Sequence, residues 1–415
     1  MKILLINHYA GSVFHGMEFR PYYLAREWVR NGHEVKIVAA SFSHLRAENP
    51  VMGNRDFMVE MISGIEYTWL LTPYYVGNGV KRAFSMIIFL YRLFKYGKAI
   101  GLEFRPDVVV ASSTYPMDIW PASRIARLSG AKLVFEIHDL WPLTPIELGG
   151  YSKKHPYIRF VQSAEDFAYK NSDCVVSILP KVNSHVLERG LVESKLHIVP
   201  NGIVSEDWTI CYDEDESICC IEREVSALKR SGYFVVGYAG SHGIPNALDH
   251  LLKAAQIIKD KKIALVLVGN GSEKGNLKKS IQAMGLDNVY SFNFVDKKFI
   301  PRLLSLFDIG YIGWKKQPLY RFGISPNKIM DYMMAGLPIL HSVEAGNDPV
   351  AECGCGITVP PEDPGAIAEA ILKFSNINKT ERTKMGLLGR YFVLQNYTYS
   401  VLASKFLDAI SLEEI

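Results

Sequence analysis

The sequence predicts a two-domain α/β protein in which each domain is built on its own parallel β-sheet. Its 415 residues are enough for two hydrophobic cores, since a single domain usually takes roughly 100 to 200 residues. Short apolar runs alternate with helix-like stretches in both halves of the chain. Strands that are apolar throughout are typical of parallel sheets whose two faces are covered by helices.

The composition is that of an ordinary folded protein and argues against several function classes. Hydrophobic residues make up 48% and charged residues 21%, and the formal net charge of +3 is too small to indicate a nucleic-acid partner. None of the six cysteines forms a C-x-x-C pair, so we predict no metal site, no cofactor and a reduced cytoplasmic setting. The longest apolar run, 83–91, is too short to span a bilayer, and the first residues lack the features of a signal peptide.

The first domain is expected at residues 1–200. It opens with a strand at 3–7, a helix at 18–30 and a second strand at 34–40. The stretches between the later strands are long enough for crossover helices, which parallel pairing requires. Four such strands are predicted, near Asp107–Ser113, Lys132–His138, Cys174–Leu179 and Leu196–Pro200.

The second domain is expected at residues 201–397. Its first part, 206–231, is polar and contains the acidic run 213–216, which we interpret as a solvated linker or surface excursion. The alternation of strand and helix then resumes and predicts a second sheet of the same kind. Its five predicted strands lie near Phe234–Gly240, Ala264–Gly269, Val289–Phe294, Ile309–Gly313 and Pro338–Ser342.

The C-terminal segment, 398–415, is predicted to be an amphipathic helix that packs back on the first domain. Packing on the second domain fits the same pattern, which by itself does not choose between the two. The apolar residues at helical spacing are Val401, Leu402, Phe406, Leu407 and Ile410.

The most informative segment, 320–338, is predicted to contain a helix with marked ends. Ser325 suits the N-cap position, Pro326 the first helical position and Gly336 the position after the last turn, while Pro338 prevents continuation. The start of a helix offers backbone N–H groups and a partial positive charge, which together bind phosphate groups. We therefore expect an anion to bind where this helix begins.

Three polar residues of this helix share one face. Asp331 lies four positions after Asn327 and three positions after Lys328. Asp331 lies roughly 6 to 8 Å along the helix at about 1.5 Å per residue, which is about the separation of a diphosphate from its ribose. Its carboxylate is a candidate acceptor for ribose hydroxyls. A well-capped helix with a solvated Asp331 is the alternative.

The segment 320–338 resembles the donor-binding signature of the retaining family 4 glycosyltransferases, in the branch with Ser-Pro-Asn-Lys followed by an acidic residue, Tyr and Met. The likeness extends over nearly the whole chain. It implies the GT-B fold, in which two Rossmann-like domains with parallel sheets face a central cleft. It also implies that the C-terminal domain holds the nucleotide-sugar donor and the N-terminal domain the acceptor.

The resemblance assigns roles to residues of this helix and of the loop before it. The second carboxylate of the family's E-x7-E motif falls on Asp331, which would bind ribose. The first falls on Gly323, so the usual carboxylate for the donor sugar is missing and backbone groups are expected to replace it. Lys328 is predicted to be catalytic, and the predicted donor-binding residues here are Phe322, Gly323, Ile324, Ser325, Pro326, Asn327 and Asp331.

Two glycine-rich turns after predicted strands add to the donor site, since a backbone without side chains can wrap an anion. In the family the first turn touches the diphosphate and often carries Arg and Lys, near the places that His242 and Asn246 take here. The second turn resembles the family's loop near base and phosphates, although alone it is an ordinary strand-to-helix turn. Base contacts are expected near 294–300. The predicted donor-binding residues of the two turns are Gly240, Ser241, His242, Gly243, Asn246, Gly269, Gly271 and Lys274.

In the first domain, polar residues lie where a predicted strand ends, which is where parallel sheets bind ligands. The stretch 135–142 resembles the E-V-R-D-L-W-P sequence of transferases that build O-antigen and capsule repeat units, including L-fucosamine transferases, with His138 in place of Arg. We predict that His138 and Asp139 are catalytic and that Glu136 binds the acceptor. A histidine satisfied at the strand end and an aspartate capping the next turn are the alternative.

The loop 9–20 matches the family's glycine-containing first loop, which lines the acceptor side. Gly11, Gly16 and Arg20 are predicted to bind the acceptor, with Arg20 meeting an acceptor pyrophosphate. An ordinary arginine at the start of a surface helix explains Arg20 equally well.

The segment 81–98 is predicted to be a helix with excess apolar surface and several basic residues, which suits an anionic membrane interface. Part of the same pattern is that of a core helix. We predict peripheral contact with the inner face of the plasma membrane, where a polyprenyl-pyrophosphate-linked saccharide would be the acceptor.

The function implied by the resemblance is metal-independent transfer of a sugar, such as an N-acetylated amino sugar or a deoxy sugar, with retention of configuration. A UDP-sugar is the expected donor, and surface polysaccharide biosynthesis is the expected setting. A sugar-nucleotide epimerase or hydrolase of the same architecture, and a nucleotide-sugar-binding subunit without catalysis, are the alternatives.

Overall fold

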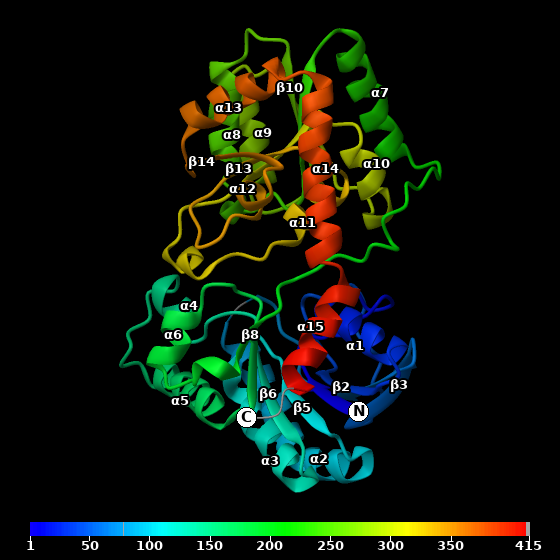
Figure 1. Ribbon diagram of the computed structural model, residues 1–415, viewed down its shortest axis with the longest axis vertical. Coiled ribbons are helices and arrows are strands. Elements are labelled where there is room, and N and C mark those ends of the chain that lie inside the picture. The colour runs from blue at the N-terminus through cyan, green and yellow to red at the C-terminus, as the bar shows by residue number, and fades with distance from the viewer. Residues whose placement is uncertain (78, 412–415) are drawn as a thin grey trace. The chain divides into compact units, whose positions relative to one another are not determined.

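A computed structural model describes residues 1–77 and 79–411, and the chain divides into two compact units (Figure 1). Unit 1 consists of residues 1–201 together with the C-terminal segment that starts at Tyr399. Unit 2 consists of residues 202–398. The boundary expected from the sequence, near residue 200, lies beside this division.

Unit 1 is built on an eight-stranded sheet with the order β3-β4-β2-β1-β5-β6-β7-β8. Its neighbouring strands pair in parallel, apart from the antiparallel edge pair β3 and β4, which the sequence analysis missed. The central strand β1 is almost fully buried on both faces, which explains its unbroken apolar sequence. The strands are β1 Lys2–Ile6, β2 Glu34–Ala40, β3 Phe57–Ile62, β4 Ile65–Leu70, β5 Val108–Ala111, β6 Lys132–Ile137, β7 Cys174–Ser177 and β8 Leu196–Ile198.

Helices cover the sheet of unit 1, and the C-terminal helix α15 packs beside α1 (Figure 1). The ring centroids of Trp28 and Phe406 are 5.1 Å apart, and the Trp28 indole Nε1 donates a hydrogen bond to the Ala403 carbonyl at 3.3 Å. The last four residues of the segment expected at 398–415 lie outside the described residues. The helices are α1 Arg20–Arg30, α2 Val80–Phe104, α3 Ile119–Ser129, α4 Leu143–Glu147, α5 Pro156–Asn171, α6 Asn183–Glu188 and α15 Tyr399–Ser411.

Unit 2 is built on a six-stranded, fully parallel sheet with the order β11-β10-β9-β12-β13-β14. Alternate residues of β10 enter separate hydrophobic clusters, Val266 on one face and Leu265 on the other, so both faces of the sheet are buried. The predicted strands are confirmed, and β14 was missed. The strands are β9 Phe234–Ala239, β10 Ile263–Val268, β11 Val289–Phe292, β12 Ile309–Gly313, β13 Ile339–Ser342 and β14 Gly356–Val359.

The polar stretch 206–231 is a linker only in its first half. The second half forms α7, whose apolar residues at spacings of three and four form one buried face of the core: Ile218, Ile221, Val225 and Leu228. Asp215 caps this helix by accepting a hydrogen bond from the Ser217 amide at 2.9 Å. The helices of unit 2 are α7 Glu216–Arg230, α8 Leu248–Ile257, α9 Lys274–Ala283, α10 Ile300–Leu304, α11 Asn327–Met334, α12 Pro349–Cys353, α13 Pro364–Asn376 and α14 Lys379–Asn396.

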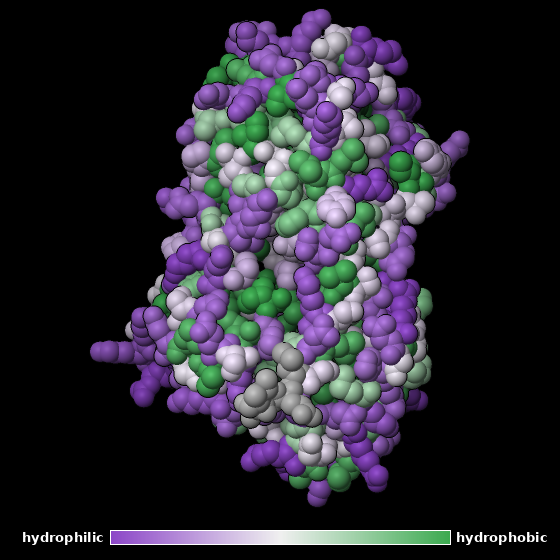
Figure 2. All heavy atoms as spheres, viewed as in Figure 1, coloured by the Kyte–Doolittle hydropathy of each residue, from purple (hydrophilic) through white to green (hydrophobic). Residues whose placement is uncertain are grey.

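Hydrophilic side chains cover most of the face in Figure 2, and apolar ones form scattered groups between them. No helix within 1–77 or 79–411 has both the length and the apolar character that crossing a bilayer requires. The same residues contain no group of three or more His, Cys, Asp or Glu side chains placed to hold a metal ion.

Candidate functional site

Two glycine turns follow β9 and β10 and pack against each other. Both Gly240 and Gly269 have positive φ angles, of 151° and 149°. A Cβ atom on Gly269 would lie 1.9 Å from the Gly240 carbonyl oxygen, so no other residue fits there without moving backbone. The His242 amide donates a hydrogen bond to the Asn270 carbonyl at 2.8 Å, which joins the turns. The two loops predicted to bind a donor therefore form one backbone surface.

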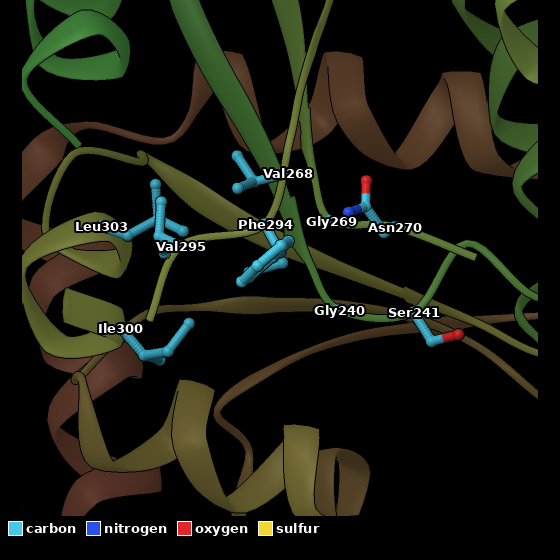
Figure 3. Close-up of a pocket in the computed structure, with 10 residues that line it drawn as sticks. Gly240, Ser241, Val268, Gly269, Asn270, Phe294, Val295, Ile300 and Leu303 are labelled. Carbon is cyan, nitrogen blue, oxygen red and sulfur yellow. The ribbon is translucent and has the colours of Figure 1, made fainter. Parts of the chain in front are cut away.

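A cavity of about 230 Å³ lies beside this surface (Figure 3). One wall is apolar and consists of Val268, Phe294, Val295, Ile300 and Leu303. The turns supply Gly240, Ser241, Gly269 and Asn270, and Ala239 at the end of β9 completes the lining. An apolar slot next to exposed backbone suits a flat nucleobase that is joined to phosphate groups.

The helix α11 begins at Asn327, so the predicted N-cap at Ser325 is wrong. Pro326 takes the N-cap position, with extended φ and ψ of −85° and 138°, and no side chain caps the helix. Proline lacks an N–H, so the first amides of α11 are those of Asn327, Lys328 and Ile329, which have no carbonyl partner inside the helix. Gly336, with φ of 66°, follows the helix as predicted.

Lys328 links α11 to the first glycine turn. Its ammonium contacts the Tyr238 hydroxyl at 3.1 Å and the side-chain oxygen of Asn246. Its aliphatic chain packs on Gly240, where a Cβ atom would approach within 2.8 Å. Burial lowers the pKa of Lys328 to about 8, because the charged form loses hydration there. The predicted residues Gly240, Asn246 and Lys328 thus lie together.

Two further predicted residues carry polar atoms without a protein partner. The His242 side chain is fully buried, and neither ring nitrogen has a hydrogen-bond partner, so burial, with Lys274 and Lys328 nearby, lowers its pKa to about 4. Burial raises the pKa of Asp331 to about 7, with Lys297 opposing the shift. No described residue donates a hydrogen bond to the Asp331 carboxylate, which leaves it available to a ligand.

Lys274 is engaged by protein rather than exposed to a ligand. Its ammonium lies 2.6 Å from the Gly269 carbonyl and 2.8 Å from that of Phe292, and it also reaches the side-chain oxygens of Asn270 and Asn293. These four acceptors exceed the three hydrogens of the ammonium. The lysine therefore joins the ends of β10 and β11, and the predicted contact with a donor would cost one of these bonds.

The loop before α11 departs from the prediction that its backbone is open to a sugar. The Gly323 amide donates to the Tyr320 carbonyl at 2.9 Å, and the Ile324 amide donates to the Asn347 side-chain oxygen at 2.7 Å. The Asn347 amide group also donates to the Ile324 carbonyl at 3.1 Å. The amides of Gly323 and Ile324 are thus already hydrogen-bonded within the protein. The Phe322 side chain is buried. Asn347 was missed, because a Gly-Asn-Asp-Pro sequence is typical of any turn.

In unit 1, the predicted acceptor residues Arg20 and Glu136 form a buried ion pair, and each is 1% exposed. The Arg20 Nε and Nη2 atoms donate to Glu136 Oε1 at 3.0 and 2.8 Å, and its guanidinium also donates to the Val199 and Pro200 carbonyls. Direct acceptor contact by these two residues does not fit the structure, because both side chains are covered and already paired.

His138 and Asp139 follow β6 and differ in their surroundings. His138 Nε2 lies 3.1 Å from Glu136 Oε2 and 3.0 Å from Ser112 Oγ. Asp139 accepts hydrogen bonds from the Leu140 amide and from the side chains of Trp141 and Thr144. Burial raises the pKa of Asp139, and these bonds oppose the rise. The aspartate thus caps the next turn, as in the alternative interpretation.

His138 lines a second cavity, of about 200 Å³, within unit 1. Among the described residues that line this cavity, Glu18 is the only charged one and none is Lys or Arg, so it suits an uncharged sugar better than a pyrophosphate. The predicted Gly11 and Gly16 shape the loop before Glu18, since a Cβ atom on Gly11 would lie 1.9 Å from the Gly16 carbonyl. The polar lining residues are Asn7, Tyr9, Glu18, Thr114, His138 and Asn201.

Comparison with known protein families shows which family the chain belongs to. The model of the glycosyl transferase 4-like domain matches residues 15–202, and that of the glycosyl transferases group 1 matches residues 233–376. The chain is a family 4 glycosyltransferase. The resemblance stated from the sequence is thereby confirmed, and so is the prediction of an enzyme.

Curated relatives of the glycosyltransferase include the probable glycosyltransferase WbjE of Pseudomonas aeruginosa, 23% identical over 76% of this chain and 78% of the relative. They also include the putative colanic acid biosynthesis glycosyl transferase WcaI of Escherichia coli, 23% identical over 60% of this chain and 61% of the relative.

Among solved structures, sucrose-phosphate synthase from Thermosynechococcus elongatus matches with a TM-score of 0.70 and 17% identity over 98% of the glycosyltransferase and 97% of that chain. Anabaena HepE, solved in complex with UDP and glucose, matches with a TM-score of 0.66 and 14% identity over 99% and 100% of the two chains. These likenesses confirm the GT-B fold, with two Rossmann-like α/β domains.

Proposed function

We propose that this glycosyltransferase moves a sugar from a UDP-sugar to a lipid-linked saccharide, with retention of anomeric configuration, in the biosynthesis of a surface polysaccharide. The observation that carries the proposal is the donor surface of unit 2, where two fused glycine turns and Lys328 adjoin an apolar slot. The WcaI relative, a putative colanic acid biosynthesis enzyme, supports the polysaccharide setting.

The donor is assigned to unit 2 residue by residue. The base occupies the slot against Phe294, and the diphosphate lies along the turn at Gly240 and Ser241 near the first amides of α11. Lys328 neutralises phosphate charge, and Asp331 accepts hydrogen bonds from ribose. The structure of HepE in complex with UDP and glucose supports the choice of UDP and of a hexose-like sugar.

The acceptor is assigned to unit 1. Its saccharide enters the cavity beside His138 and Glu18, where polar groups replace water around sugar hydroxyls. The anionic pyrophosphate stays outside this cavity, because the described residues that line the cavity include no Lys or Arg.

The reaction needs no covalent intermediate with the protein. An acceptor hydroxyl oxygen forms the new bond to the anomeric carbon while the bond from that carbon to the diphosphate oxygen breaks on the same face. The hydroxyl proton passes to the departing diphosphate, so UDP leaves as the sugar is transferred. The protein contributes orientation and charge stabilisation by Lys328 and by backbone amides at the start of α11.

The deciding experiment incubates the purified protein with a panel of nucleotide sugars and a synthetic polyprenyl-pyrophosphate disaccharide. Release of UDP together with a glycolipid product whose new linkage keeps the donor's anomeric configuration, measured by NMR, is the expected result. A new sugar-nucleotide epimer without glycolipid would favour the epimerase alternative. Tight binding without any turnover would favour the non-catalytic alternative.

We further propose that α2 rests on the membrane that holds this acceptor. Phe84, Ile87, Tyr91 and Phe94 are exposed at spacings of three and four and form one apolar stripe on α2. Lys81 and Lys98 lie at the two ends of this stripe and suit anionic lipid headgroups.

A flotation assay with vesicles of phosphatidylglycerol and phosphatidylethanolamine tests this surface. The variant Phe84→Ser/Ile87→Ser is expected to lose most of the vesicle-bound fraction, while transfer to a water-soluble acceptor stays unchanged. The matched control is Leu387→Ser/Leu388→Ser, which removes two exposed apolar side chains from α14 in unit 2. Equal vesicle binding by the α2 variant and the wild type would contradict the proposal.

A further inference from the structure

A buried polar chain runs from α1 to the wall of the cavity in unit 1. Arg20 holds Glu136 through Oε1, and the other carboxylate oxygen of Glu136 faces Ser112 and His138. Arg20, Ser112 and Glu136 are all at most 1% exposed, whereas the His138 side chain retains 12% exposure and lines the cavity. Arg20, Ser112 and Glu136 are therefore too buried to touch a substrate. Any effect that they have on the reaction is exerted through the position and protonation of His138.

We propose that Arg20, Ser112 and Glu136 are positioning residues that hold the His138 ring with its Nε2–H directed at the Glu136 carboxylate, so that Nδ1 accepts a hydrogen bond from a sugar hydroxyl in the cavity. The assignment of that sugar rests on the function proposed above. The orientation and protonation of the ring rest on contacts within unit 1 alone.

The neighbours of Nε2 decide which nitrogen carries the proton. Burial alone would raise the pKa of Glu136, but Arg20, His138 and Ser112 together hold it well below its ordinary value, so the carboxylate is ionised and can only accept. The Ser112 hydroxyl donates its single hydrogen to Glu136 Oε2 at 2.5 Å and can only accept toward His138. Both groups within reach of Nε2 are acceptors, so a hydrogen on Nε2 satisfies both.

The opposite nitrogen then has a free lone pair. No described residue lies within hydrogen-bond distance of Nδ1, and His138 lines a cavity of about 200 Å³. A bare Nδ1 attracts an O–H or N–H donor and repels a carbonyl or phosphate oxygen. The residue thus selects a hydroxyl at one position of the bound saccharide.

Several acidic residues lie around the His138 ring, and Arg20 pairs with the one that touches it. Glu136 touches the ring from β6, and Asp118 acts on it from the 3₁₀ turn before α3. Asp139 follows it in sequence, and Glu18 lines the same cavity. Arg20 compensates Glu136 from behind and is itself fixed by the Val199 and Pro200 carbonyls. Without Arg20, Glu136 would be a buried carboxylate lacking its strongest partner, which is strongly disfavoured.

Two measurements on Glu136→Gln test the proposal. In the wild type, ¹⁵N-histidine NMR should show His138, assigned by its loss in His138→Gln, as the Nε2–H form at neutral pH. In the variant this preference should weaken, and kcat/KM should fall about tenfold or more.

Matched variants separate this role from a purely structural one. Arg20→Gln/Glu136→Gln removes the whole ion pair and leaves no unpaired buried charge, so it should fold and show the same tautomer change if Glu136→Gln alone does not fold. Asp118→Asn removes a nearby carboxylate that is not bonded to the ring and should leave the tautomer unchanged. An Nδ1–H form in the wild type, or an unchanged Nε2–H preference in both Glu136→Gln and the double variant, would overturn the proposal.

The experiments distinguish failure of the proposed function from failure of this inference. If no nucleotide sugar supports transfer by the wild type, the proposed function fails, while the NMR measurement still reports the ring. If transfer occurs but His138 is found as the Nδ1–H form, only this inference fails.

Discussion

The side chains of the proposed donor surface are held in a state that a bound nucleotide would relieve. Lys328 keeps its charge in a partly buried place, and His242 and the Asp331 carboxylate lack the hydrogen-bond partners that buried polar groups usually have. Such groups cost stability in a protein without ligand. A nucleoside diphosphate would supply negative charge to Lys328 and ribose hydroxyls to Asp331, so the same features favour binding.

Asp331→Ala is expected to weaken UDP binding more than tenfold, because the ribose would lose the carboxylate proposed to accept its hydrogen bonds. Isothermal titration calorimetry measures the dissociation constant. Asp260→Ala, which removes an exposed carboxylate from the same unit, is the control and should bind UDP like the wild type. An unchanged constant for Asp331→Ala would remove this residue from the site.

UDP affinity is expected to fall as the pH rises through about 8. The pKa of Lys328 is about 8 in the free protein, and only its charged form attracts phosphate, so binding favours protonation and takes up a proton near and above that pH. Calorimetry at pH 8.5 in two buffers of different ionisation enthalpy measures the uptake. Lys328→Met should abolish it, and an uptake that persists in this variant would assign the proton to another group.

Among the secondary-structure elements, neighbouring loops hold the donor surface in place. The turns after β9 and β10 pack so closely that only glycine fits at position 269. Lys274 joins the end of β10 to the end of β11. Asn347, from the loop after β13, makes two hydrogen bonds to the backbone of Ile324. These bonds fix the path of the chain into α11. The direction of the first amides of α11 therefore depends on Asn347, which lies 23 positions after Ile324.

Asn347→Ala is expected to raise the KM for the nucleotide sugar about fivefold or more and to lower kcat, with a smaller change in UDP binding. The reason is that Asn347 holds the loop at Ile324 and touches neither the glycine turns nor Lys328. Steady-state kinetics together with calorimetry separate the two effects. Asn347→Asp keeps the acceptor for the Ile324 amide and loses only the second bond, so an intermediate effect is expected; equal loss of UDP and sugar-nucleotide binding would contradict this role.

Across the full length of the molecule, the chain returns to its first unit after completing the second. Trp28 and Ala403 are 375 positions apart in sequence, yet their hydrogen bond and the packing of Phe406 join α15 to α1. Phe406 is fully buried, so α15 belongs to the hydrophobic core of unit 1. Truncation at the C-terminus would therefore damage the N-terminal unit.

Phe406→Ala is expected to destabilise unit 1 by about 3–5 kcal/mol, the usual cost of removing a buried phenylalanine side chain. Urea unfolding followed by tryptophan fluorescence should show an earlier transition, since Trp28 packs on this ring. Lys405→Ala, at an exposed position of the same helix, is the control. UDP binding to unit 2 should be unaffected, and loss of that binding in the folded variant would contradict the assignment of α15.

Contiguous patterns of residues were enough to predict most strands, the class of fold and the family, because apolar runs and glycine turns are local and the signature 320–338 is unbroken. They also located the glycine turns, Lys328 and Asp331. They missed the antiparallel strand β3, whose partly exposed residues lack the unbroken apolar pattern of the central strands.

Which polar residues face a cavity became visible only in the folded chain. Arg20 and Glu136 looked like ligands of the acceptor, but each is the other's partner across 116 positions of sequence. Asn347 looked like a turn residue and instead holds the loop before α11. Burial and pairing depend on side chains that folding brings together from distant positions, and a one-dimensional pattern does not contain those contacts.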